Sequence, residues 1–146
     1  MTPTLNNQIA DALVKTLKAI RPPDYRTSPY VHRGVSSGIL NGPERPIVCV
    51  ILSGLIDEKK VAGKRHDRAL RMTIYVETAD IEVADEALDD LIEDIHECIA
   101  TNETLDGLAM LPIDIGEDRR VVDPSGQAGI ASAEIPIEAR YRVSHP

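Results

Sequence analysis

The clearest hydrophobic pattern lies between residues 68 and 100. In residues 69–77 apolar and polar side chains alternate, which predicts a strand with one buried face. The apolar positions then change to three- and four-residue spacing, at Ala84, Leu88, Leu91, Ile95 and Cys98. This spacing predicts an amphipathic helix, with Asp80 expected to cap its first turn. A two-faced strand that leads into a two-faced helix indicates a layer of helix on sheet.

The N-terminal half adds a second helix and two strands. Residues 4–20 carry an apolar stripe that ends at Pro22 and Pro23, which predicts a helix. Residues 24–45 are rich in Pro, Gly and Ser, with one short strand expected at 30–35. The apolar run at 46–52 predicts a central strand that is covered on both faces.

The C-terminal half predicts two more strands, at 108–115 and 131–143. Pro112 and Pro136 lie inside them, and because proline cannot donate to a ladder, each is expected at an edge, a bulge or an unpaired position. We therefore expect both strands at the rim of the sheet. The polar segments near 54–67 and 116–129 are expected to be mobile loops, the first of them a hairpin connection. The prediction is a single α+β domain over residues 1–146. Its mainly antiparallel sheet has four to five strands, with two amphipathic helices packed on one face.

Composition and net charge restrict the classes of function that this chain can have. The 146 residues include no Trp and no Phe, and 24 acidic against 16 basic residues give a net charge of −8. This balance does not favour nucleic-acid binding through the general surface. Cys49 and Cys98 lie at apolar positions, as free buried thiols would in a reducing compartment. We expect no signal peptide, no membrane span and synthesis in the cytoplasm.

Candidate chemistry is sparse. The four histidines are not at ligand spacing, and we find no nucleophile elbow, Walker loop or dinucleotide fingerprint. We therefore expect no enzymatic activity, cofactor or metal. The alternative is a small metal-dependent enzyme that uses the adjacent pair His66 and Asp67, or the acidic helix. A host-side regulatory or antitoxin-like binding module is a third class.

Charge is strongly segregated along the chain. The predicted helix carries an acidic face made of Asp85, Glu86, Asp89, Asp90, Glu93, Asp94 and Glu97. A basic group lies in and beside the hairpin loop, made of Lys59, Lys60, Lys64, Arg65, Arg68 and Arg71. Both are also what ordinary solvated surfaces look like. The alternative hypothesis is that the basic arm of one copy contacts the acidic helix of its neighbour, because opposite potentials set register.

The order of these elements resembles the tail terminator (tail completion) proteins of long-tailed bacteriophages and related contractile particles. That family often has a Thr-Leu-Gly-Gly-like turn after its second helix, and residues 104–107 read Thr-Leu-Asp-Gly, with Asp106 where glycine is common. The resemblance implies a virion protein of the tail and neck that is assembled in the host cytoplasm. It implies a ring, commonly a hexamer, that caps the tail tube and stops its polymerisation. The other face of the ring would meet the neck or head-completion proteins, and DNA would pass through without specific binding.

Within this interpretation two loops are candidate interfaces. Lys59, Lys60, Lys64 and Arg65 are expected to touch the tail tube protein or the next subunit. The second loop, with Arg119, Arg120 and Asp123, is expected to touch another ring partner. Whether the acidic helix face of Asp85, Asp89, Glu93 and Glu97 lines the channel stays open. Another head-tail connector of the neck is the alternative within the same class.

Overall fold

The computed structural model describes residues 2–35, 46–60, 63, 65–79, 83–122 and 130–144, without the side chains of 57–60 and 122. The elements, in order, are α1 (Leu5–Leu17), β1 (Tyr30–Arg33), β2 (Ile47–Lys60), β3 (Arg65–Ala79), α3 (Ala84–Ala100), β4 (Asp114–Ile115), β5 (Arg119–Val122) and β6 (Ile130–Ser144). The predicted α+β class is confirmed.

The strands form one sheet in the order β1-β2-β3-β6-β4, and β5 also pairs with β6. β1 runs parallel to β2, whereas the other pairs are antiparallel. The sheet has six strands rather than four to five. The additional strand arises because the outer edge of β6 is shared between β4 and β5, each too short to show a periodicity in the sequence.

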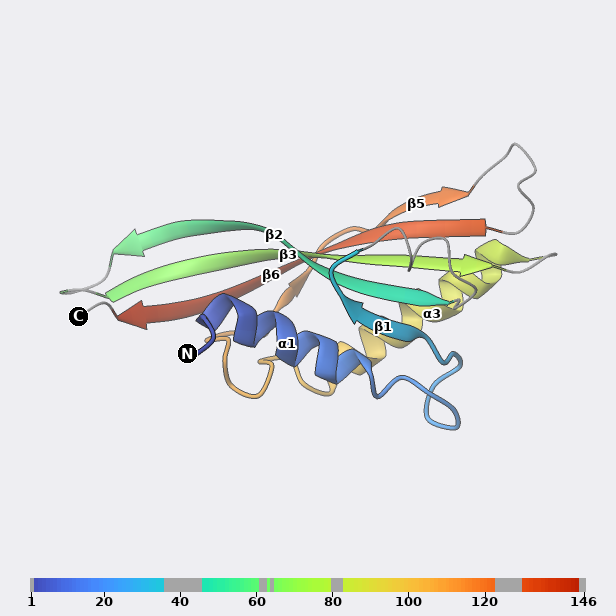
Figure 1. Cartoon of the computed structure of the whole chain (residues 1–146), viewed down its shortest axis with the longest axis horizontal. Coiled ribbons are helices and arrows are strands. Elements are labelled where there is room, and N and C mark those ends of the chain that lie inside the picture. The colour runs from blue at the N-terminus through green and yellow to red at the C-terminus, as the bar shows by residue number, and fades with distance from the viewer. Residues whose placement is uncertain are drawn as a thin grey trace.

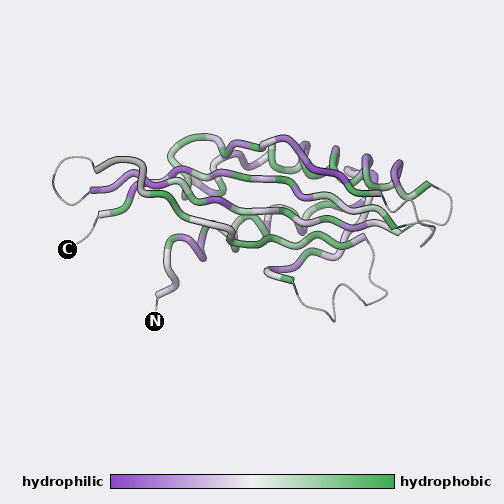
Figure 2. Tube along the Cα trace, turned by 90° about the horizontal axis from the view of Figure 1, so that it is seen from above, coloured by the Kyte–Doolittle hydropathy of each residue, from purple (hydrophilic) through white to green (hydrophobic). Residues whose placement is uncertain are grey.

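Both helices lie on the same side of the sheet, as predicted (Figure 1). α1 contacts β1 and β2, while α3 contacts β3 and β6. Along the long strands hydrophobic and hydrophilic residues alternate (Figure 2), so that one face supplies the core. The largest buried side chains are Tyr141, Ile9, Leu13, Leu17, Ile47, Leu70, Met72, Ile74, Leu88, Leu91, Ile95 and Ile99. Ile47 to Val50 are buried on both faces, which confirms the prediction for that part of β2.

The helix termini differ in how they are capped. The Thr4 hydroxyl accepts a hydrogen bond from the Asn7 amide at 3.2 Å and so caps α1. α3 begins at Ala84, and Val83 before it supplies no side-chain cap. Asp80, the predicted cap, lies outside the described residues.

The predicted loop over 54–67 was wrong in its extent, because β2 continues to Lys60 and β3 begins at Arg65. The pairing of β2 with β3 shifts register between Leu52 and Gly54 and again between Asp57 and Lys59. Each shift moves the following side chains to the opposite face, so the sequence loses its regular alternation although the strand continues. The far ends of β2, β3 and β6 extend beyond α1 as a three-stranded arm (Figure 1).

The strand predicted at 108–115 was also wrong in its extent. Turns occupy residues 101–110, and pairing as a strand begins only at Asp114. Leu105, Asp106 and Gly107 have φ of 51°, 61° and 82°, so the turn after α3 contains three consecutive left-handed residues. Asp106 therefore adopts the conformation in which glycine is easiest to accommodate. Residues 119–122 of the second predicted loop form β5, and 123–129 lie outside the described residues.

We had predicted from Pro136 that β6 lies at the rim of the sheet, and this was wrong. It pairs with β3 along its full length and with β4 and β5 on its other side. The Pro136 carbonyl accepts a hydrogen bond from the Gly116 amide at 2.8 Å, on that outer side. The missing proline N–H thus falls in the gap between β4 and β5, an unpaired position, as expected for proline in a sheet. Pro112 lies outside the strands.

Candidate subunit interface

The predicted basic arm is only partly described. Arg65 is exposed at the start of β3, opposite Ser144 of β6. Lys59 and Lys60 belong to β2, but their side chains are outside the described residues, as are Lys64 and Asp123 altogether. The hypothesis that this arm binds a neighbour therefore stays a prediction.

The acidic face of α3 is present, with one correction. The side chains of Asp85, Asp89, Glu93 and Glu97 are exposed. Asp94, which the sequence placed on the same face, is 0% exposed. Its helical position is turned toward the loop that connects α1 to β1, not toward solvent.

Asp94 fastens that loop to α3. Its Oδ2 accepts hydrogen bonds from the Arg26 amide at 3.0 Å, the Thr27 amide at 2.7 Å and the Thr27 hydroxyl at 2.7 Å. Its Oδ1 accepts one from the Arg26 guanidinium at 2.9 Å. The guanidinium also binds exposed Glu97 at 3.1 Å, and the two carboxylates raise the pKa of Arg26. This network fixes the approach of the chain to β1.

Arg120, a candidate residue of the second loop, forms an ion pair with the acidic face of α3. Its guanidinium lies 2.8 Å from Asp89 on α3 and 2.6 Å from Asp118, and these carboxylates raise its pKa. Hydrogen bonding to Arg120 in turn lowers the pKa of Asp118. β5 is therefore tied to the acidic face of its own chain, whereas Arg119 is exposed on the other face of the sheet.

A basic groove that sequence reasoning missed lies between α1 and β1. Two adjoining hollows of about 510 and 430 Å³ share Lys18, Val31 and His32. Lys15 and Arg21 also line this groove. Lys15, Lys18 and Arg21 are exposed and form no ion pair with the described residues. The signal was available in the three-residue spacing of these cations, which begins in the last turn of α1.

Large apolar side chains are exposed at both edges of the sheet. On the β1 side Tyr30 is 50% exposed, with its ring 3.7 Å from that of His32 between centroids. Beside it His32 Nε2 is buried without a hydrogen-bond partner among the described residues. On the β5 side Val121 is 58% exposed. Edges of this kind present unused backbone groups and apolar surface to another chain.

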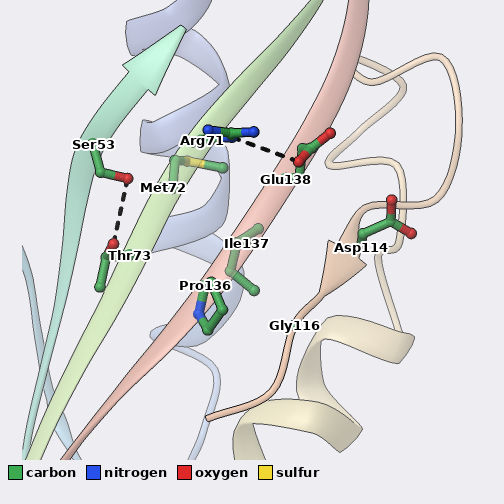
Figure 3. A pocket seen from close by; sticks show the side chains of 9 residues that line it. All are labelled: Ser53, Arg71, Met72, Thr73, Asp114, Gly116, Pro136, Ile137 and Glu138. Carbon is green, nitrogen blue, oxygen red and sulfur yellow. Dashed lines mark hydrogen bonds and ion pairs between the residues drawn. The ribbon is translucent and has the colours of Figure 1, made fainter. Parts of the chain in front are cut away.

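A small depression lies on the sheet around β3 and β6 (Figure 3). Its volume is about 210 Å³, below the 300–1,000 Å³ typical of ligand pockets. Arg71 and Glu138 face each other across it at 3.8 Å, and Thr73 donates to Ser53 at 3.3 Å. These side chains bind one another, and their arrangement suits a water-covered sheet surface better than a reaction centre.

The residues considered for chemistry do not converge. His66 and Asp67 are adjacent in β3 and so point to opposite faces, and Arg142 holds Asp67 at 2.7 Å. Cys49 and Cys98 are free and buried, as predicted. Within the described ranges no three His, Cys, Asp or Glu side chains are grouped for metal binding. No described helix has the length and apolarity that a membrane span requires.

Comparison with known proteins identifies a related architecture. No protein-family model matches the sequence, and no curated protein matches it. Among solved structures the chain is similar to the sheath/tube terminator of an extracellular contractile injection system, PVC, in the extended state. The TM-score is 0.50 at 13% identity, and the match covers 99% of this chain. The fold is terminator-like. The chain matches 58% of the length of the PVC protein.

Proposed function

We propose that this chain is a structural subunit that caps a tail tube as a closed ring and stops tube polymerisation. The supporting observation is the likeness of nearly the whole chain to a sheath/tube terminator, over 99% of its residues at a TM-score of 0.50. In this proposal the other face of the ring meets the neck of a phage head, and the assembled protein resides in the virion. The chain acts by assembly and not by catalysis.

The surface of the molecule agrees with this role. Its two sheet edges differ, since β1 borders a basic groove and β5 borders an acidic helix. Two different edges favour head-to-tail contacts between copies, and such contacts close into rings when the rotation between neighbours closes. A hexamer with an open channel is the expected product.

The test uses the full-length protein and the tail-tube protein of the same particle. Tube polymerisation is started with and without substoichiometric terminator, and tube lengths are measured by electron microscopy. We expect shorter tubes with a ring density at one end, and native mass spectrometry should give a closed oligomer of about six copies, alone or on the tube. Unchanged tube lengths and no end density would overturn the proposal.

A further inference from the structure

We infer that neighbouring copies join their sheets by pairing β1 of one copy antiparallel with β5 of the next. This inference deepens the proposed ring and rests on it.

The backbone of β1 has groups free for such pairing. The amides of Tyr30 and Gly34 donate to the carbonyls of Pro46 and Val50, at 2.8 Å each. The backbone N–H and C=O groups of Tyr30, His32 and Gly34 therefore face β2. Val31, between them, turns its own N–H and C=O toward the outer edge, where the described structure has no further strand.

The backbone of β5 has a matching free group. The Pro136 carbonyl accepts from Gly116, so the even-numbered residues of β6 direct their backbone groups toward β4 and β5. Ser132 therefore forms a hydrogen-bonded pair with Val121, whose backbone faces β6. The next residue back, Arg120, consequently directs its N–H and C=O outward.

The two edges lie at the same height on the sheet. Following the pairing across the strands gives one row, made of Tyr30, Ile47, Glu77, Ser132 and Val121. The adjacent row joins Val31 to Arg120 in the same way, through Val48, Val76 and Ala133. β1 and β5 run in opposite directions, since the intervening pairs are one parallel and three antiparallel.

A second copy related by rotation about an axis parallel to the strands keeps these rows aligned. Val31 then opposes Arg120, and both already direct their backbone groups outward, as a hydrogen-bonded antiparallel pair requires. Tyr30 opposes Val121 in the closer, non-hydrogen-bonded row. These two apolar side chains, 50% and 58% exposed in the single chain, would cover one another.

The charges beside the two strands are complementary. Next to β1 the basic groove presents Lys15, Lys18 and Arg21. Beside β5 a hollow of about 470 Å³ is lined by Asp85, Glu86, Asp89, Asp90 and Arg120. Because both helices lie on the same side of the sheet (Figure 1), continuing the sheet into the next copy sets α1 beside the next α3. The neighbour's acidic surface would therefore meet the basic groove.

Disulfide trapping tests the row. The double variant Tyr30→Cys/Val121→Cys is oxidised under assembly conditions and run on non-reducing gels. Directly opposed residues in a non-hydrogen-bonded row have Cα atoms about 4.5 Å apart, within disulfide range. We expect a ladder of oligomers up to the closed ring, and no ladder from either single variant.

The matched control is Tyr30→Cys/Arg119→Cys, because Arg119 lies on the same face of β5 but two residues away. Its diagonal separation of about 7–8 Å should slow cross-linking roughly tenfold. Rings that assemble normally but cross-link equally well, or not at all, in both pairs would overturn this interface while the proposed function stands. No assembly of the wild-type protein, with or without tube protein, would overturn both.

Charge exchange gives an independent measurement. Lys18→Glu should weaken assembly roughly fivefold to tenfold at low salt, and less at high salt, because exposed charges are screened. Asp85→Lys should do the same. The combination of both in one chain should restore assembly, since each junction then again joins opposite charges. An additive loss in the combined variant would overturn the charge contact.

Discussion

Replacing Asp94 by alanine tests most directly how the loop before β1 is attached to α3. The side chain is 0% exposed and accepts two backbone amides, one hydroxyl and one guanidinium from Arg26 and Thr27. Alanine removes both carboxylate oxygens and leaves these donors facing a cavity. The loop that leads into β1 then loses its attachment to α3.

The expected loss can be estimated from the donors. Each buried donor left without an acceptor costs about 1–3 kcal/mol. Arg26 is 49% exposed, so water replaces much of its contact and only the Thr27 and Arg26 main-chain donors and the hydroxyl count in full. For these three donors we expect a loss of about 3–5 kcal/mol in the free energy of unfolding, near the lower end of their summed cost, because the loop can relax toward solvent. The melting temperature should fall by roughly 10 °C or more.

The matched control is Glu97→Ala. Glu97 binds the same Arg26 guanidinium at 3.1 Å but is 47% exposed, so its removal should cost less than about 1 kcal/mol. Urea unfolding followed by circular dichroism gives both free energies. Equal losses for Asp94→Ala and Glu97→Ala would refute the argument that burial, rather than charge pairing, makes Asp94 important.

Three further measurements test other parts of the fold. A Cβ on Gly116 would lie 2.7 Å from Pro136 Cγ, so Gly116→Ala should cost about 1–3 kcal/mol in urea unfolding. A Cβ on Gly54 would lie 4.0 Å from the Cβ of Arg71, so Gly54→Ala should change stability by less than about 0.5 kcal/mol; equal losses for the two variants would contradict this. Burial raises the pKa of Cys49 to about 11 from 9.0, so its contribution is complete below pH 9 and lost as pH rises to 11. Cys49→Ala should therefore lose about 2–3 kcal/mol less than wild type over that interval, and parallel pH curves would argue against a buried thiol. Asp106 has φ of 61°, so Asp106→Val should cost about 1–2 kcal/mol while Asp106→Gly stays within about 1 kcal/mol; equal thermal shifts would mean that the left-handed turn is not maintained in solution.

The parts of the fold that could be predicted were those in which one period persists. α1, α3, β3 and β6 each keep a single spacing of apolar residues over many positions. α1, α3 and β6 were predicted close to their observed bounds, whereas β3 begins at Arg65, four residues before the predicted strand. The part of β2 beyond Leu52 was not predicted, because two register shifts break the alternation of its apolar and polar residues. The strand predicted at 108–115 coincides with β4 only in its last two residues, and β5 was missed, because strands of two and four residues are too short to show a period of their own.

The proposed interface was harder to predict than the fold. The acidic face of α3 could be predicted from spacing alone, but helical spacing does not reveal that the loop before β1 folds over Asp94. The basic groove exists because β1 pairs in parallel with β2 and lies beside α1. Nothing in the local sequence of these segments indicates that they are neighbours. The equal height of Tyr30 and Val121 depends on four strand registers in succession, none of which is written in local sequence.

Pro136 limits where a neighbouring copy could pair in the proposed assembly. By interrupting hydrogen bonding on the outer side of β6, it divides that margin into two short pieces, so a second chain finds only the four residues of β5 to align with. A long uninterrupted margin would accept neighbours in many sliding positions and invite fibres. In the proposed assembly a short margin limits neighbours to one alignment, and a single fixed rotation between copies is what their contacts need in order to close on themselves.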